Sequence, residues 1–414
     1  MPEFFSKLVV FDLPTSTGNL AVTGVGFQPK ALILYGCNAL ADGWSNTVPG
    51  VFVGAVDEAG GQWATASVTD DGTQDGACIL NESTCLQIFS NAAGAIDAVA
   101  SFVSFDSDGF TIDVTNAPAS AGIKVGAIAL GGLDCQSAVA FTSVTANGAW
   151  SVSGLAFSPE VVFHVGTKLN GAGTDATAAH LGIGFFTAGV HRHYDYQLPD
   201  GGSADAHTAS NDRIIRHNRT AGGTTGFDWD GSLTSINADG FTFSAGGGPL
   251  EGQRRAWLCI AGGDHTVGTI TIPGANTAPG FPTNVLITIG CGSATFNIPV
   301  GSENYGLGAG DRTSRMAIAH RIAGSSSGVY RDTTLDWITD TDTNTNTLEE
   351  TGNFTIAGSG FTTSEVVTGG AKAGWYWAIA GDLPPLGGGN RWWWWRGSWR
   401  CWSCSARAQS RSTR

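Results

Sequence analysis

The chain has 414 residues and a net charge of −14, and its composition excludes several classes of protein. Only 14% of the residues are charged, against ~25% in typical soluble proteins. The 60 glycines are about twice the number expected for an average protein of this length. This profile predicts many short strands joined by turns. Six of the 21 basic residues follow Asp382, whereas all 35 acidic residues lie at or before it. The acidic body therefore disfavours nucleic acid, and the lack of any run of ~18–20 apolar residues argues against membrane insertion.

The first third of the chain has a recognisable succession of strand signals. Leu8–Phe11 is followed by the entry Gly26–Lys30 and the apolar run Ala31–Cys37. An Asp-Gly turn then begins Gly109–Ile112, and Val125–Gly132 is apolar on both faces and ends at paired glycines. A strand with two apolar faces is typical of the buried centre of a sheet. We expect the last two strands to form the hairpin that closes a domain.

The same succession occurs twice more along the chain. The phenylalanine of the entry recurs after 130 and then 124 positions, at Phe27, Phe157 and Phe281. A period near 125 residues is that of a tandem domain, because solenoid units repeat every ~20–50 residues. We therefore predict an all-β protein of three tandem β-sandwich, jelly-roll-like domains with few or no helices. The predicted boundaries are 7–134, 135–264 and 265–382.

The last segment, 383–414, is a different kind of sequence. It is rich in Gly, Trp and Arg and includes four consecutive tryptophans, Trp392–Trp395. Tryptophan has the single codon TGG, and a TGG tract shifted by one base encodes glycine, as in the glycines just upstream. We expect this tail to be non-globular, and to be an out-of-frame reading from about Arg391 onwards.

The three repeats differ most in their middles, and the second middle, residues 170–218, holds five of the eight histidines. In it, His191, His193 and Asp195 alternate along a predicted strand and so share one face. Imidazole and carboxylate groups are ligands for a transition metal ion, and one His-x-His from each chain of a homotrimer would supply six nitrogens. The alternative is a solvated or stacked polar face without metal. No other cofactor is expected.

The motifs that resemble catalytic sites lack their required context. Gly324–Gly328 matches a nucleophile elbow, but no helical pattern follows it. Asp340–Asn344 begins like a calcium loop without the glycine and glutamate that such a loop needs. Acidic residues are plentiful, yet nothing in the sequence pairs two of them for glycoside hydrolysis. We therefore expect no enzymatic activity.

Cys78 and Cys85 are either buried thiols or a loop disulfide.

Three short patterns resemble repeats found in structural proteins of tailed phages. They are Gly-Phe-x-Pro-Lys at 26–30, Asp-Gly-Phe-Thr at 108–111 and 239–242, and Ala-Leu-Gly-Gly at 129–132. The resemblance implies a virion component, in a tail fibre, collar or capsid decoration, that is made in the host cytoplasm without a signal peptide. It implies self-association, with a homotrimer favoured, and contact with other virion proteins. The alternatives are a glycan-binding array for host attachment and, less favoured, a polysaccharide hydrolase.

Overall fold

A computed structural model describes most of the chain up to Gly381. The described residues are 3–45, 49–70, 76–169, 171–175, 178–199, 206–221, 224–247, 253–272, 276–277, 279–291, 304–323, 326–341, 348–357, 360–367 and 372–381. The predicted tail 383–414, much of the calcium-like stretch and the first two residues of the elbow-like motif lie outside them.

All regular elements of the described residues are β-strands, as the composition predicted. The first strand set comprises β1 (Phe5–Asp12), β2 (Gly18–Thr23), β3 (Pro29–Cys37), β4 (Gly43–Ser45), β5 (Gly50–Val56), β6 (Gln62–Thr69), β7 (Gly76–Asn81), β8 (Leu86–Phe89), β9 (Ile96–Asp106), β10 (Gly109–Asn116) and β11 (Lys124–Gly131). The second comprises β12 (Gln136–Val144), β13 (Gly148–Val152), β14 (Val161–Gly166), β15 (Gly173–Asp175), β16 (Ala178–Phe186), β17 (His191–Pro199), β18 (Ala206–Ser210), β19 (Ile215–Ala221), β20 (Thr224–Asn237), β21 (Gly240–Gly247) and β22 (Gln253–Ala261).

The third strand set follows the same plan to the end of the described residues. It comprises β23 (His265–Ile272), β24 (Asn276–Thr277), β25 (Thr283–Cys291), β26 (Asn304–Gly310), β27 (Arg315–Ala323), β28 (Ser326–Asp332), β29 (Trp337–Thr341), β30 (Leu348–Ala357), β31 (Gly360–Val367) and β32 (Lys372–Ala380). Among the described residues, no helix is long and apolar enough to cross a membrane.

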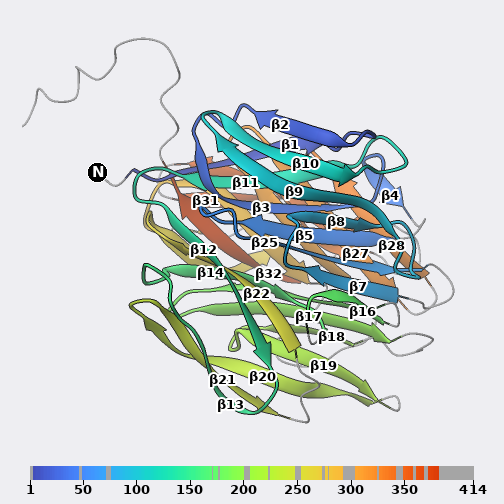
Figure 1. Ribbon diagram of the computed structural model, residues 1–414, viewed down its shortest axis with the longest axis vertical. Helices are drawn as coiled ribbons and strands as arrows, with labels where there is room; N and C mark the ends of the chain where they lie inside the picture. Colours follow the sequence, from blue (N-terminus) through green and yellow to red (C-terminus); the bar gives the residue numbers. More distant parts are fainter. Residues whose placement is uncertain are drawn as a thin grey trace, which may run out of the picture. The chain divides into compact units, whose positions relative to one another are not determined.

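In each strand set the strands, drawn as arrows in Figure 1, form one larger and one smaller antiparallel sheet. The order of strands repeats from set to set. The larger sheets run β1-β11-β3-β5-β6-β7, β12-β22-β14-β16-β17-β18 and β23-β32-β25-β26-β27-β28. The smaller sheets run β2-β10-β9-β8, β13-β21-β20-β19 and β24-β31-β30-β29. One expectation is wrong. β10 and β11 do not form a hairpin, because β10 pairs with β2 and β9 whereas β11 pairs with β1 and β3 in the other sheet.

The two sheets of each set share an apolar core. In the first set, Leu32 and Leu34 of β3 belong to the same buried cluster as Phe110 and Ile112 of β10. Corresponding clusters join β14, β21 and β22 in the second set and β25, β30, β31 and β32 in the third. Phe110 and its counterparts Phe241 and Phe361, which recur in the sequence, are therefore core anchors, each buried to 3% exposure or less.

The opposite faces of the three larger sheets meet in one central core. Along β3, Ile33 and Tyr35 point into this core, while their neighbours point into the core of the first set. Burial on both faces explains why the central strands read as continuous apolar runs. The contacts join all three sets: Trp63 stacks on Phe163 at 6.1 Å between ring centroids, Phe185 lies 6.3 Å from Trp377, and the Tyr35 hydroxyl donates to the Met316 carbonyl at 2.8 Å.

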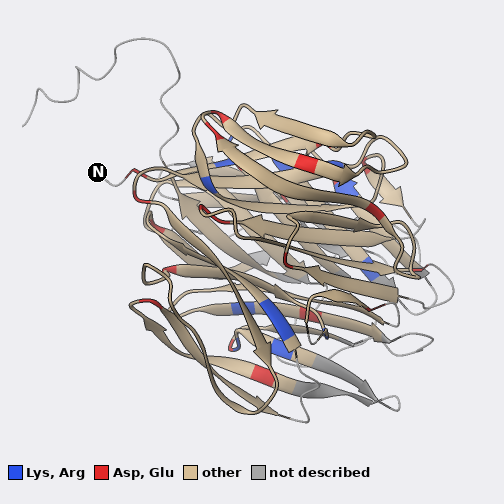
Figure 2. Ribbon diagram, viewed as in Figure 1, with Lys and Arg blue, Asp and Glu red and all other residues tan. Residues whose placement is uncertain are grey.

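Short strands also cross from one set to another. β15 of the second set adds to the edge of the first larger sheet, pairing with β7, and β4 of the first set pairs with β28 of the third. Met1–Pro384 accordingly forms one compact unit. Charged residues are thinly spread over its strands (Figure 2). The division into three domains at 134 and 264 stays a prediction.

Candidate functional site

The three residues predicted to bind metal, His191, His193 and Asp195, all lie on β17, but they are not equally buried. His193 and Asp195 are completely buried, whereas His191 is half-buried. His193 donates from Nε2 to the Arg216 carbonyl at 3.0 Å and stacks on His164 at 5.2 Å. These side chains are therefore not a solvated face, and His193 and Asp195 point into the chain rather than toward a surface where copies could meet.

Asp195 is instead the centre of a different group, which draws on three strands. His180 of β16 places Nε2 2.9 Å from Asp195 Oδ2. His217 of β19 places Nδ1 3.0 Å from His180 Nε2 and 3.9 Å from the same carboxylate oxygen. All three residues are buried, and their ligand atoms lie within 4.8 Å of one another. His180, Asp195 and His217 thus form a triangle, here called the His-Asp-His triangle.

Strand pairing brings these residues together. β16 and β17 are neighbours in the second larger sheet, where Gly182 pairs with Asp195, two residues from His180 along its strand. His217 comes from the smaller sheet, which packs on the larger one. The triangle therefore joins the two sheets. Gly182 keeps the space beside it open, because a Cβ there would lie 2.9 Å from Asp195 Oδ2.

Arg255 of β22 occupies the rest of that space. Its Nη1 lies 2.7 Å from the position of a Gly182 Cβ, and its guanidinium stands over the Trp229 ring at 5.4 Å. Nη2 donates to Gln253 at 3.2 Å, but Nε and Nη1 have no hydrogen-bond partner among the described residues. Both ring nitrogens of the buried His164 are likewise unpartnered there. Unpaired buried donors and acceptors are costly, so Arg255 and His164 mark a polar region inside the second set.

For the ionisable residues of this interior, burial disfavours the charged form, whereas a neighbouring opposite charge favours it. Burial lowers the pKa of His180 to about 4, partly offset by Asp195, and lowers that of His193 to about 3. For Asp195, burial acts to raise the pKa, but His180 and His217 outweigh it and the pKa falls below its usual value. Burial lowers the pKa of Arg255 to about 10, against the attraction of Asp195. At neutral pH, Asp195 and Arg255 are therefore charged while His180 and His193 are neutral.

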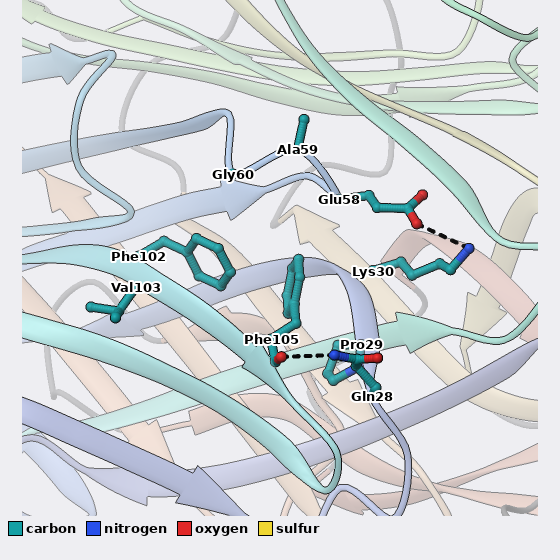
Figure 3. Close-up of a pocket in the computed structure, with 9 residues that line it drawn as sticks. All are labelled: Gln28, Pro29, Lys30, Glu58, Ala59, Gly60, Phe102, Val103 and Phe105. Carbon is teal, nitrogen blue, oxygen red and sulfur yellow. Dashed lines mark hydrogen bonds and ion pairs between the residues drawn. The ribbon is translucent and has the colours of Figure 1, made fainter.

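A second candidate is an open groove of about 570 Å³ on the first set. It lies where the predicted Gly-Phe-x-Pro-Lys entry, the turn after β5 and β9 meet. Figure 3 shows the rings of Phe102 and Phe105 beside the Lys30–Glu58 ion pair, which is 3.1 Å long. The two rings are 4.5 Å apart, and Gln28 donates to the Phe105 carbonyl at 2.9 Å. Apolar rings with a few polar groups are the usual lining of a ligand site.

Other residues have structural roles. Trp375 and Trp377 are completely buried in the central core. Cys78 and Cys85 are free, buried thiols whose pKa burial raises to about 12. Asp57 accepts backbone hydrogen bonds from Gly61 at 2.7 Å and Val139 at 2.6 Å, so its carboxylate holds a turn.

The sequence did not single out His180, His217 or Arg255. The one signal that could have found the histidines was their concentration in 170–218, since five of the eight lie there. Comparison with known proteins adds no assignment: no family model matches the chain. No curated protein matches it either.

Proposed function

We propose that this protein is a structural component of a tailed-phage particle, built from three tandem β-sandwich domains and acting by self-assembly and display rather than by catalysis. The observation that carries the proposal is the central core, to which the larger sheets of all three sets contribute. Together with the exchanged strands β4 and β15, it joins the three strand sets into one compact unit. A compact unit with few charges suits repeated packing in a particle.

The proposed partners are further copies of the chain, with a trimer favoured, and other virion proteins. Multi-angle light scattering of the purified full chain tests this, together with negative-stain images of the same sample. We expect trimers or larger rods and rings that persist on dilution. A monodisperse monomer at high concentration would contradict self-assembly.

The groove in Figure 3 favours a second function, glycan binding for host attachment. Its two aromatic rings offer apolar faces, and Lys30, Glu58 and Gln28 offer polar groups around them. A sugar presents the same combination of apolar faces and hydroxyl groups. Like the virion assignment, this function is a proposal.

A glycan array with three forms of the protein tests the second function. We expect the wild type to bind specific glycans and Phe105→Ala to lose at least ~10-fold in affinity, because ring contact is removed. The matched control is Leu133→Ala, which removes a side chain that is 79% exposed and is not among the residues lining the groove. Equal binding by Phe105→Ala and the wild type, or no specific hit, would reject the groove as a glycan site.

A further inference from the structure

We propose that the His-Asp-His triangle of His180, Asp195 and His217 binds one divalent transition-metal ion, which joins the two sheets of the second strand set. The inference is independent of the proposed function. It differs from the metal site predicted from the sequence, because two of the three ligands come from strands other than β17.

The edges of the triangle come within about 0.4 Å of the ligand spacing of a tetrahedral metal site. Metal–ligand bonds of ~2.0–2.2 Å place neighbouring ligand atoms of a tetrahedral site ~3.3–3.6 Å apart. The three edges measure 2.9, 3.0 and 3.9 Å, on both sides of that range. Two imidazoles and one carboxylate are a donor set used for zinc and for other borderline metal ions.

Hydrogen bonding alone serves the same three atoms poorly. A neutral imidazole has one N–H, and an ionised carboxylate only accepts. If His180 Nε2–H and His217 Nδ1–H both donate to Asp195, neither nitrogen has a lone pair for the 3.0 Å edge between them, and if one imidazole nitrogen accepts from the other it cannot donate to the carboxylate. A cation at the centre would receive a lone pair from each of the three atoms. His193 Nε2 also lies 3.9 Å from Asp195 Oδ2, but it donates to the Arg216 carbonyl and so has no lone pair for a metal ion.

Arg255 is the second, independent observation. It is completely buried, and its Nη1 and Nε have no partner among the described residues, although Nη1 lies beside Gly182 next to Asp195. A metal ion with three protein ligands retains a fourth position. With Arg255 nearby, an anion such as chloride or hydroxide in that position would limit the buried positive charge and accept the free N–H groups.

The test uses the untagged full chain, stripped with a chelator and titrated with Co²⁺ and with Zn²⁺. We expect one equivalent bound per chain and a higher melting temperature with metal, since binding favours the folded state. Asp195→Asn and His217→Gln should each weaken Co²⁺ binding more than ~100-fold. His191→Gln is the matched control, because it changes a histidine of β17 outside the triangle and should leave the affinity unchanged.

Less than a tenth of an equivalent bound, or equal binding by the wild type and Asp195→Asn, would overturn the proposal. X-ray absorption at the zinc edge of the wild type keeps the test decisive if the variants fail to fold. Two imidazoles and one carboxylate per zinc are expected. A shell without imidazole, or loss of zinc binding in His191→Gln, would instead place the ion elsewhere.

Discussion

The first and second strand sets have the same strand order and both have an apolar core, but the second set also buries a row of polar residues where the first is apolar. One row of paired residues across each larger sheet makes the comparison direct. The row is Val125, Gly36, Phe52 and Ala66 in the first set, and Arg255, Gly166, Gly182 and Asp195 in the second. Opposite these rows, Ile88 of β8 in the first set corresponds to His217 of β19 in the second.

The first two rows each contain one large side chain, but of opposite polarity. A Cβ on Gly36 would meet the Phe52 ring at 2.4 Å, whereas a Cβ on the matching Gly166 would meet the Arg255 side chain at 2.3 Å. The Arg255 side chain thus covers Gly166 as the Phe52 ring covers Gly36, although it comes from a different strand. The corresponding row of the third set has no large side chain and consists of Gly374, Gly290, Gly306 and Ala319.

The largest effect is expected when a carboxylate is placed in the apolar row. Ala66→Asp puts a charge at a site that is 2% exposed and belongs to the apolar core of the first set. We expect the free energy of unfolding at pH 8 to fall by about 3–5 kcal/mol, the usual cost of an uncompensated buried charge. Urea denaturation measures it, with Ala66→Val as the control for added volume. Equal stability of Ala66→Asp and Ala66→Val would show that the row in the first set tolerates a buried charge as well as the row in the second set does.

A somewhat smaller effect is expected when the polar row receives the ring of the apolar row. Gly182→Phe should reduce the free energy of unfolding by about 3 kcal/mol, because the ring meets Arg255 and Asp195. Adding Arg255→Val, which restores three of the four residue types of the first row and leaves Asp195 in place, should recover about half of the loss. The coupling is read from denaturation of the two single variants and the double variant. Strictly additive losses would show that the two positions do not share one space.

The third strand set has a buried carboxylate, Asp336, whose pKa is raised, whereas that of Asp195 in the second set is lowered. Burial raises the pKa of Asp336 to about 7, with Asp311 adding to the rise and the Phe354 N–H and Arg315 opposing it. Between pH 4 and 7 the unfolded chain releases this proton while the folded chain keeps it, so rising pH favours unfolding. We expect Asp336 to remove about 3 kcal/mol of stability across that interval.

Denaturation of the wild type and of Asp336→Asn at pH 5 and pH 8 measures this contribution. The free energy of unfolding of Asp336→Asn minus that of the wild type should be larger at pH 8 than at pH 5, since the variant has no proton to release. The same difference between the two proteins at both pH values would show that Asp336 does not titrate in this range.

The smallest effect belongs to the exposed ion pair of the groove. Lys30 and Glu58 are 28% and 48% exposed in their side chains, so water screens their attraction. Glu58→Gln should change the free energy of unfolding by less than about 1 kcal/mol. If Glu58→Gln lowered the free energy of unfolding as much as Ala66→Asp, burial would not determine how strongly a charged group affects stability in this protein.

Local patterns in the sequence were enough to predict the strands and their repetition. The apolar runs at 31–37 and 125–132 became β3 and β11, because burial on both faces leaves its mark in each strand separately. Pairing is not local, so the sequence wrongly placed β10 and β11 in one hairpin. The shared central core was likewise not foreseen, since nothing in one strand says which sheet covers its second face.

Of the three residues predicted from the sequence to bind metal, only Asp195 belongs to the His-Asp-His triangle. Alternation along one strand identifies residues that share a face, as His193 and Asp195 do, but not the residues of other strands that meet them. The partners of Asp195 are His180 and His217, which lie 15 positions before it on β16 and across the core on β19. Only strand pairing and the packing of the two sheets bring them together.

The central claim is that the polar interior of the second set is a built site rather than a tolerated departure from the apolar core of the first. Anomalous X-ray scattering from crystals grown with zinc tests it most directly. We expect one strong peak within bonding distance of His180 Nε2, Asp195 Oδ2 and His217 Nδ1, and none at the matching place in the first set. Zinc peaks only at surface residues, with the three side chains still hydrogen-bonded to one another, would contradict the claim.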